Sequence, residues 1–416
     1  MPRVIEHIID QHAGDAAFLW LQRDEATDAP HHRRKELDRL DERLEAHIDG
    51  LRVAGEWGWR AAEAAFEQYG EPGEAFVAAV LAFENHSERR IARVLNSIAS
   101  SAELSRAVIA ALGWVEPSLL RGTVQALLGD SDPQKRLLGL AACSVHRVDP
   151  AARLVEFLDD AAPTRARALR LVGELGRADL LPEIRRALRD PDDSCRFWAA
   201  WSAALVGDRR DAPQALCEQA GTDNRLGRKG LQVLLSAMDT ESALAWLNNM
   251  RGDPSKARLL AAGAGVFGDP SFVPWLLTQM RDSKLARVAG ESFSMISGVE
   301  LETEGLATSA PNAVEHSEDE DIDDETHRDY YLPWPDRSKI IQWWRQNEAN
   351  FSRGNRYLLG RQLAAGNLEA VFATGAQRQR RAAALEMALA TPRAPLANCS
   401  LRTISSAANA GWLLSA

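Results

Sequence analysis

Arginine and tryptophan side chains occur at matched positions of two consecutive units in the middle of the chain. Arg167 and Arg170 lie two and five positions after a basic residue that marks one unit, and Trp198 and Trp201 hold the same places in the next. Because an arginine is costly to bury without a partner, we expect this stripe to be open to solvent. Tryptophan and arginine dominate interface hot spots, so the pattern predicts a concave surface that binds a protein partner.

A second interpretation of the same residues stays open. Both tryptophans could instead fill a wide gap between neighbouring units, because large aromatic rings stabilise a core as well as an interface. Replacing Trp198 and Trp201 with alanine distinguishes the interface hypothesis from the core hypothesis. Lost folding would indicate a core role, and lost partner capture with intact helicity would indicate an interface.

Residue patterns typical of catalysis are missing from the sequence. A di-iron centre on helical repeats needs paired His-Glu motifs, but Glu6-His7 and Glu315-His316 are reversed and far apart. Only His146 of the nine histidines falls within the repeated region, where we expect it to end a helix. Neither a Gly-x-Ser-x-Gly elbow nor a phosphate-cradling Gly-x-x-x-x-Gly-Lys loop occurs. We therefore expect no catalytic, cofactor-binding or metal-binding residues.

Charge and cysteine usage narrow the class of protein further. The formal net charge is −10, and residues 141–300 hold 21 basic and 21 acidic residues, which argues against a nucleic-acid groove. The four cysteines match neither a metal knuckle nor a dense disulfide scaffold, so a reducing compartment is expected. The first residues lack the pattern of a signal peptide, and no apolar run nears the ~18 residues of a membrane span. These features predict a cytoplasmic protein that does not bind membranes.

The elements that must position the stripe recur with a period near 31 residues. A landmark, usually a glycine beside an acidic residue or proline, closes one helix and opens the next, and it recurs at Gly113, His146, Gly176, Gly207, Asp239, Gly268 and Gly298. Within a unit the apolar residues keep helical spacing, as Leu180, Leu181, Ile184 and Leu188 do before the Asp190-Pro191 break. The period predicts an all-α solenoid of stacked antiparallel helix pairs.

Pairs of acidic and basic residues recur with the same period. An Asp in each turn precedes a Lys or Arg by five or six positions, in the pairs Asp130/Lys135, Asp160/Arg165, Asp190/Arg196, Asp223/Arg228, Asp253/Arg258 and Asp282/Arg287. A carboxylate in the turn can accept from free helix N–H groups, while a guanidinium can bridge to the next turn. We interpret the pairs as a ladder that joins one unit to the next, rather than as a track for a charged ligand.

The flanking regions are predicted to cap the array. Residues 1–112 should form a helical region of degenerate capping repeats, with one long helix whose apolar stripe comprises Leu37, Leu40, Leu44, Ile48 and Leu51. The repeats occupy residues 113–299, an acidic mobile insertion residues 300–329, and a helical cap with a tail residues 330–416.

The acidic insertion and the segment after it carry distinct signals. Residues 315–325 hold eight acidic side chains, a density that predicts a solvated loop; a calcium loop is disfavoured because no central glycine is present. The following Tyr330–Asp336 segment is stiffened by prolines and should latch onto the last repeats, with Asp336 capping the next helix.

The turn aspartates, helix arginines and closing Gly-Asp steps resemble HEAT-like repeats of bacterial solenoid proteins, over roughly Gly113 to Gly298. Three further segments carry a narrower resemblance: LRVAGEWGW at 51–59, GDPSFVPWLL at 268–277, and YLPWPD at 331–336 with Trp343-Trp344. Together these look like an uncharacterised proteobacterial HEAT-repeat family encoded among type VI secretion genes. The resemblance implies a scaffold in that context and no catalytic residues.

The function expected from these observations is a non-enzymatic protein-binding scaffold, adaptor or chaperone. Its expected partner is a protein on the concave face, and the resemblance points to a component of the secretion spike or an effector. An immunity-type inhibitor of a secreted toxin is one alternative. A HEAT-fold enzyme or cofactor lyase is the other, because fold alone does not decide function.

Overall fold

The computed structural model describes residues 5–97, 101–221, 225–310 and 329–402, and these residues form an all-α solenoid of stacked helix pairs. The strands in this part of the chain are two short antiparallel pairs. The described residues divide into two compact units. Unit 1 holds residues up to 28, from 32 to 206 and from 393 to 402, and unit 2 holds 29–31 and 207–392.

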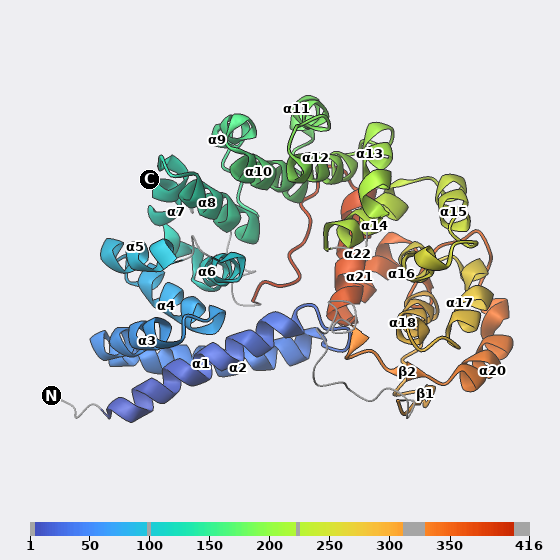
Figure 1. Ribbon diagram of the computed structural model, residues 1–416, viewed down its shortest axis with the longest axis horizontal. Coiled ribbons are helices and arrows are strands. Elements are labelled where there is room, and N and C mark those ends of the chain that lie inside the picture. Colours follow the sequence, from blue (N-terminus) through green and yellow to red (C-terminus); the bar gives the residue numbers. More distant parts are fainter. Residues whose placement is uncertain (1–4, 98–100, 222–224, 311–328, 403–416) are drawn as a thin grey trace. The chain divides into compact units, whose positions relative to one another are not determined.

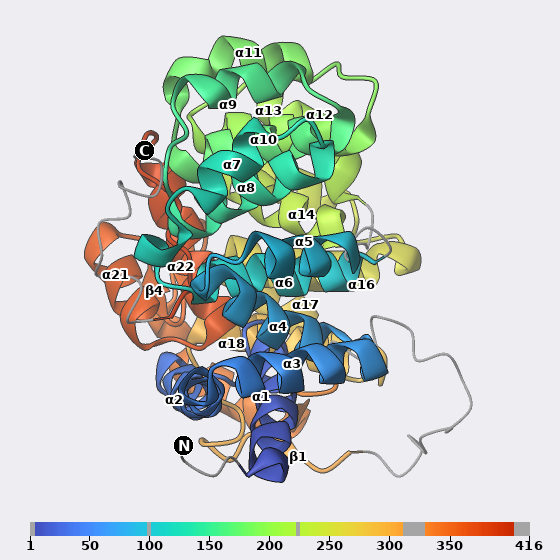
Figure 2. The same ribbon diagram turned by 90° about the vertical axis from the view of Figure 1, so that its left-hand side faces the viewer.

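Unit 1 is built from twelve labelled helices among its described residues (Figure 1). They are α1 (Glu6–Ala26), α2 (Arg34–Ala54), α3 (Glu56–Tyr69), α4 (Pro72–Glu84), α5 (Glu88–Ser97), α6 (Ala102–Trp114), α7 (Thr123–Gly129), α8 (Pro133–His146), α9 (Ala152–Glu156), α10 (Ala162–Leu175), α11 (Leu181–Ala187) and α12 (Asp193–Leu205). Helices α4, α6, α8, α10 and α12 pack in succession, and we call them the inner row of unit 1. Figure 2 shows α1, α4, α6, α8 and α10 following one another up the view.

Unit 2 continues the same pattern with shorter pairs. Its elements are α13 (Asp211–Ala220), α14 (Arg225–Ala237), α15 (Thr240–Asn248), α16 (Ala257–Phe267), α17 (Val273–Gln279), α18 (Ala286–Ser297), β1 (Ala307–Thr308), β2 (Trp334–Pro335), α20 (Arg337–Asn347), β3 (Tyr357–Leu358), β4 (Arg361–Gln362), α21 (Ala365–Thr374) and α22 (Gln377–Ala390). Helices α14, α16 and α18 pack in succession as the row of this unit.

A close approach between successive helices recurs in both units. The Cβ of any residue replacing Gly173 on α10 would lie 2.5 Å from the Ser202 hydroxyl on α12, and that hydroxyl donates to the Leu169 carbonyl at 2.7 Å. In unit 2 a Cβ at Gly265 would lie 2.7 Å from the Ser292 hydroxyl. Glycine thus lets the backbones approach while serine satisfies its own buried hydroxyl, which holds neighbouring repeats in one register.

The predicted charge ladder is confirmed between repeats of unit 1. Arg165 binds Asp190 of the next repeat through both carboxylate oxygens, at 2.7 and 3.0 Å. Arg136, one position after the predicted Lys135, binds Asp160 in the same way, at 2.6 and 2.7 Å. In this geometry the hydrogen bond from Arg136 lowers the pKa of Asp160. Bidentate pairs of this kind fix orientation as well as distance, so the rungs set the spacing of the turns.

The predictions for the helix ends and the latch are also confirmed. His146 is the last residue of α8, and its Nε2 lies 2.8 Å from the Leu112 carbonyl oxygen. The Asp336 side chain accepts from the backbone N–H groups of Ser338 and Lys339 and so caps α20. The preceding strand β2 packs on α18, where the Arg287 guanidinium lies 4.4 Å from the centre of the Trp334 ring.

The regions after the repeats differ from the predicted insertion and cap. Residues 300–310 were expected within a mobile insertion, but Leu301 is buried and β1 pairs with β2, because apolar side chains here complete the last repeat. The acidic run 315–325 lies outside the described residues. Residues 330–416 were expected as one region, yet residues 393–402 belong to unit 1 and the preceding residues to unit 2.

Candidate functional site

The four residues predicted to bind a partner lie on two adjacent helices of unit 1. Arg167 and Arg170 belong to α10, and Trp198 and Trp201 belong to α12. The Arg170 guanidinium lies 4.7 Å from the centre of the Trp198 ring, and the Trp198 and Trp201 rings meet edge to face at 5.4 Å. The structure therefore joins an arginine and a tryptophan from consecutive repeats by a cation–π contact, although the two residues do not hold matched places in their repeats.

The burial of these residues separates the two tryptophans. Arg167, Arg170 and Trp198 are partly exposed. Trp201, which was expected to be open to solvent, is only 7% exposed, because its ring turns onto the buried face of α12. The gap-filling interpretation therefore holds for Trp201, while Trp198 presents an accessible ring.

Three of the four residues line a shallow groove of about 310 Å³. Its lining comes from α8, α10, α12 and the N-cap of α12, and the lining residues are Leu137, Ala162, Pro163, Ala166, Arg167, Arg170, Asp192, Ser194 and Trp198. Among the described residues, the buried Nε of Arg167 finds no hydrogen-bond acceptor. Burial lowers the pKa of Arg167, with repulsion from Arg170 as the second cause. A carboxylate or carbonyl oxygen in the groove would relieve both costs.

Glu174, which was not among the predicted residues, joins this groove to the C-terminal end of α10. Its carboxylate is 2% exposed and accepts from the Arg170 Nε at 2.9 Å and from the Ser144 hydroxyl. Arg147 lies 3.7 Å from the second oxygen. Burial alone would raise the pKa of Glu174, but Arg170, Arg147 and Arg167 outweigh it and lower the pKa to about 2. The four-residue step from Arg170 to Glu174 was the available signal, since such pairs share a helix face.

The C-terminal ends of α8 and α10 are crossed by residues 393–402, which we call the strap. Figure 1 draws it as an extended dark red chain running from beside α10 toward α2. The Leu396 N–H donates to the Glu174 carbonyl at 2.9 Å, and the Arg147 Nε donates to the Leu396 carbonyl at 2.6 Å. The Asn398 side chain donates to the Val145 carbonyl at 3.0 Å. The strap thus uses the carbonyl groups that helix ends leave unpaired.

Glycine at position 176 makes this crossing possible. Gly176 ends α10 with a φ of +69°, in the left-handed region that favours glycine. A Cβ there would also lie 2.6 Å from the carbonyl carbon of Arg393. The landmark glycine therefore serves both the helix end and the path of the strap.

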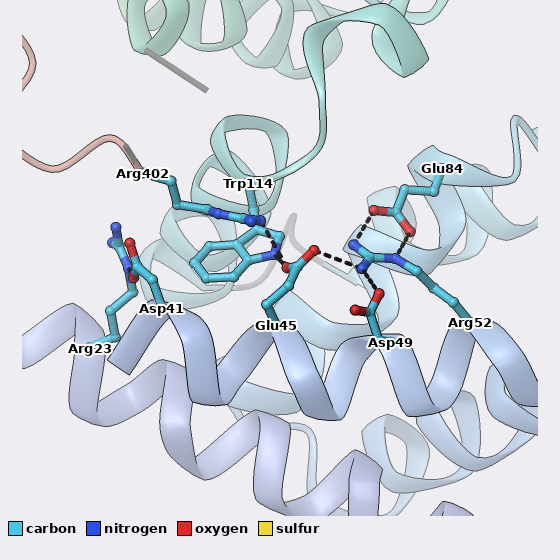
Figure 3. A network of polar contacts seen from close by, with 8 residues as sticks. All are labelled: Arg23, Asp41, Glu45, Asp49, Arg52, Glu84, Trp114 and Arg402. Carbon is cyan, nitrogen blue, oxygen red and sulfur yellow. Dashed lines mark hydrogen bonds and ion pairs between the residues drawn. The ribbon is translucent and has the colours of Figure 1, made fainter. Parts of the chain in front are cut away.

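The far end of the strap inserts an arginine beside α2 and α6, as Figure 3 shows. The Arg402 side chain is only 7% exposed, and its guanidinium lies 4.1 Å from the centre of the Trp114 ring. Its Nη1 donates to Glu45 at 2.8 Å, and the Trp114 Nε1 donates to the same oxygen at 2.8 Å. Arg52 holds the other oxygen of Glu45, also at 2.8 Å. We call Glu45 and Trp114 the arginine pocket.

Arginines of unit 1 bind the strap mostly through its backbone. Arg23 donates to the Ser400 carbonyl at 2.7 Å, and Arg34 donates to the Leu401 carbonyl at 3.2 Å. With the bond from Arg147, three guanidinium groups bind three carbonyl oxygens. Because every peptide carries carbonyl groups, these contacts recognise an extended chain whatever its side chains.

No group of three His, Cys, Asp or Glu side chains in the described part of the chain could hold a metal ion. The helices described by the structure include none with the length and apolar character that a bilayer crossing requires. A second groove, of about 560 Å³, lies in unit 2 between the segment 354–365 and helices α21 and α22.

A family model for HEAT repeats matches residues 151–236, a range that includes all four predicted residues and every residue lining the groove except Leu137. No curated protein matches the sequence. Repeats of this kind stack helix pairs into extended surfaces that bind other proteins. This match over part of the chain and the helical architecture together support a HEAT-like repeat protein.

Proposed function

We propose that the chain is a non-enzymatic scaffold that holds a segment of another protein in the groove of α8, α10 and α12. The observation that carries the proposal is the half-buried pairing of Arg170 with Trp198 beside the unsatisfied Nε of Arg167. Aromatic and arginine side chains in a partly desolvated groove are typical anchors of protein interfaces.

The chemistry of the groove selects an acidic or carbonyl-rich segment. The groove offers the Arg167 Nε as a hydrogen-bond donor and the Trp198 ring for an apolar or aromatic contact, while Glu174 already engages Arg170. A volume of about 310 Å³ lies at the lower end of the range for ligand sites and accommodates one or two side chains. The partner therefore inserts a short anchor and relies on neighbouring surface for the rest of its affinity.

The resemblance of three segments to a family encoded among type VI secretion genes supplies the biological context of the proposal. In that context the partner is a component of the secretion spike or an effector, and the chain serves as adaptor or chaperone during assembly. The basis is the set of motifs at 51–59, 268–277 and 331–336, which lie outside the groove.

The test is co-expression of the full chain with the proteins encoded beside it, followed by capture. Trp198→Ala should abolish capture and keep the helical circular dichroism, because the ring is partly exposed. Trp57→Ala is the matched control, since Trp57 is a 42% exposed ring on α3 that does not line the groove. Capture that survives Trp198→Ala would contradict the proposed site. A captured toxin would replace the adaptor role with the immunity-type role.

Trp201→Ala provides the contrasting variant. Trp201 is buried, so its removal should cost about 3 to 5 kcal/mol of folding free energy, as for other buried aromatic residues. Denaturation curves of the two variants measure the difference. Equal destabilisation by Trp198→Ala would assign both rings to the core.

A further inference from the structure

We infer that the residues that hold the strap form an exchangeable binding site, which we call the cradle. It consists of Arg23, Arg34, Glu45, Trp114, Arg147 and the C-terminal end of α10. Residues 393–402 occupy the cradle in cis, and an extended, arginine-bearing segment of a partner protein occupies it in trans. The inference deepens the proposed scaffold function by naming a second contact surface and the kind of segment that fits it. It is carried by the contacts of the strap, which differ from those of a permanent core element.

The strap buries few of its own side chains. Cys399 and Arg402 are buried, at 4% and 6% exposure, whereas Arg393, Pro395 and Ala397 are exposed. Segments with little apolar burial open at low free-energy cost relative to global unfolding. The strap can therefore leave the cradle while unit 1 stays folded.

The cradle keeps its charges paired when the strap departs. Glu45 would still accept from Arg52 and from the Trp114 Nε1, as Figure 3 shows, and Arg23 would still bind Asp41 at 2.6 Å. Removing one member of a buried ion pair is usually costly because the other is left uncompensated. That cost is absent at Glu45.

Glu174 at the other end of the cradle is equally self-sufficient. Arg170 and Ser144 bind its carboxylate without any help from the strap, and only its backbone carbonyl loses the Leu396 N–H. The vacated surface thus presents preorganised donors, which lowers the cost of binding a new segment.

Specificity comes from the arginine pocket. The Trp114 face and the Glu45 carboxylate together suit a planar, charged guanidinium, which can stack and donate at once. Arginines 23, 34 and 147 then bind the carbonyl groups of whatever chain precedes that arginine. The fitting partner is an extended segment with an arginine about six residues after its first anchored carbonyl, as Arg402 follows Leu396.

The test measures binding of a fluorescently labelled peptide of residues 392–402, with Cys399→Ser to prevent oxidation, to the full-length chain. In the wild type the cis strap competes at high effective concentration, so the peptide should bind weakly. In full-length Arg402→Ala the pocket is vacant, and binding should tighten by about tenfold or more. A peptide carrying Arg402→Ala should not bind either chain.

Two further measurements separate exchange from a structural role. Glu45→Gln combined with Arg402→Ala should remove the gain in peptide binding, because the carboxylate that pairs with the guanidinium is gone. In the wild type, hydrogen exchange at the amides of residues 394–402 should be faster than in α8 and α10. Equal peptide affinity of the wild type and Arg402→Ala, or strap amides as protected as those helices, would overturn the inference.

The outcome is independent of the test of the groove. A chain that captures its partner through Trp198, yet shows no tighter peptide binding after Arg402→Ala, keeps the scaffold function and loses the cradle. A chain that binds the strap peptide while Trp198→Ala leaves capture unchanged keeps the cradle and loses the proposed groove.

Discussion

The C-terminal ends of α8 and α10 in unit 1, and of α16 and α18 in unit 2, are each covered by a later segment of the chain. The two covering segments differ in structure. In unit 2 the segment around Tyr357–Gly360 crosses α16 and α18, with the Leu359 N–H donating to the Met295 carbonyl at 2.7 Å. It continues into α21 and α22, which enclose an apolar cluster of Leu358, Leu368, Val371 and Ala383. In unit 1 the covering is the strap, an extended chain bound through arginines.

The comparison shows that one repeat architecture carries two kinds of covering, one that buries apolar side chains and one that is held mainly by hydrogen bonds. The close approaches at Gly173 and Gly265 repeat the same geometry, so the helical rows themselves do not differ in this respect. The coverings differ in what they bury. Apolar burial stabilises the helix pair α21 and α22 strongly. The hydrogen bonds of the strap contribute little net free energy, because water replaces them when the strap is released.

The largest difference should appear when one leucine is shortened in each covering. Leu368→Ala in the unit 2 cluster should cost about 2 to 5 kcal/mol of folding free energy, because its side chain is 6% exposed among apolar neighbours. Leu396→Ala in the partly exposed strap should cost less than about 1 kcal/mol. Urea denaturation measures both. Equal costs would remove the distinction between the coverings.

The next effect concerns pH and the buried carboxylate of Glu174, on the helix end that the strap crosses. The pKa of Glu174 is lowered to about 2, so its ionised form stabilises the folded state above the ordinary glutamate pKa of about 4.3. This contribution should disappear as the pH falls from about 4.3 toward 2. Stability curves at stepped pH should show the loss in the wild type and a flatter profile in Glu174→Gln. The exposed Glu241→Gln serves as control, and a steep profile in Glu174→Gln would contradict the assignment.

Alanine in place of Gly176 and Gly268, where the two covering segments cross a helix end, gives a further comparison of the two units. Gly268 and Gly176 both have positive φ, which costs a residue with a Cβ about 1 to 2 kcal/mol. At Gly268 the Cβ would also meet the Tyr357 backbone of the permanent covering, so Gly268→Ala should destabilise unit 2. Gly176→Ala should instead displace the strap and speed hydrogen exchange at residues 394–402. Unchanged strap exchange would show that the crossing at Gly176 is unimportant.

The smallest effect is expected at a rung of the charge ladder. Asp160→Asn removes one charge of a partly exposed pair with Arg136 and should cost about 1 kcal/mol or less. The cost should shrink further in 1 M salt, where exposed charges are screened. Thermal denaturation at low and high salt gives the measurement, and a salt-independent loss would assign Asp160 a different role.

Local sequence patterns were sufficient for most of the fold. The 31-residue period, the helix-ending His146 and the capping Asp336 are each a property of a short stretch and its own backbone. The rung from Arg165 to Asp190 was also predictable, because it joins neighbouring repeats. The spacing of Arg167, Arg170 and Trp198 placed them on one stripe of adjacent helices, but the specific contact between Arg170 and Trp198 came from the structure.

Tertiary structure alone decided the rest, because periodicity reveals which face a helix buries but not which distant segment covers it. Trp201 is buried, although it holds the place in its repeat that the partly exposed Arg170 holds in the preceding repeat. Arg147 binds Leu396 across 249 residues and Glu45 binds Arg402 across 357, separations at which no helical pattern carries information. The groove is formed by neighbouring repeats, so the repeat spacing was enough to locate it. The cradle exists only because the chain returns to its first unit after residue 392.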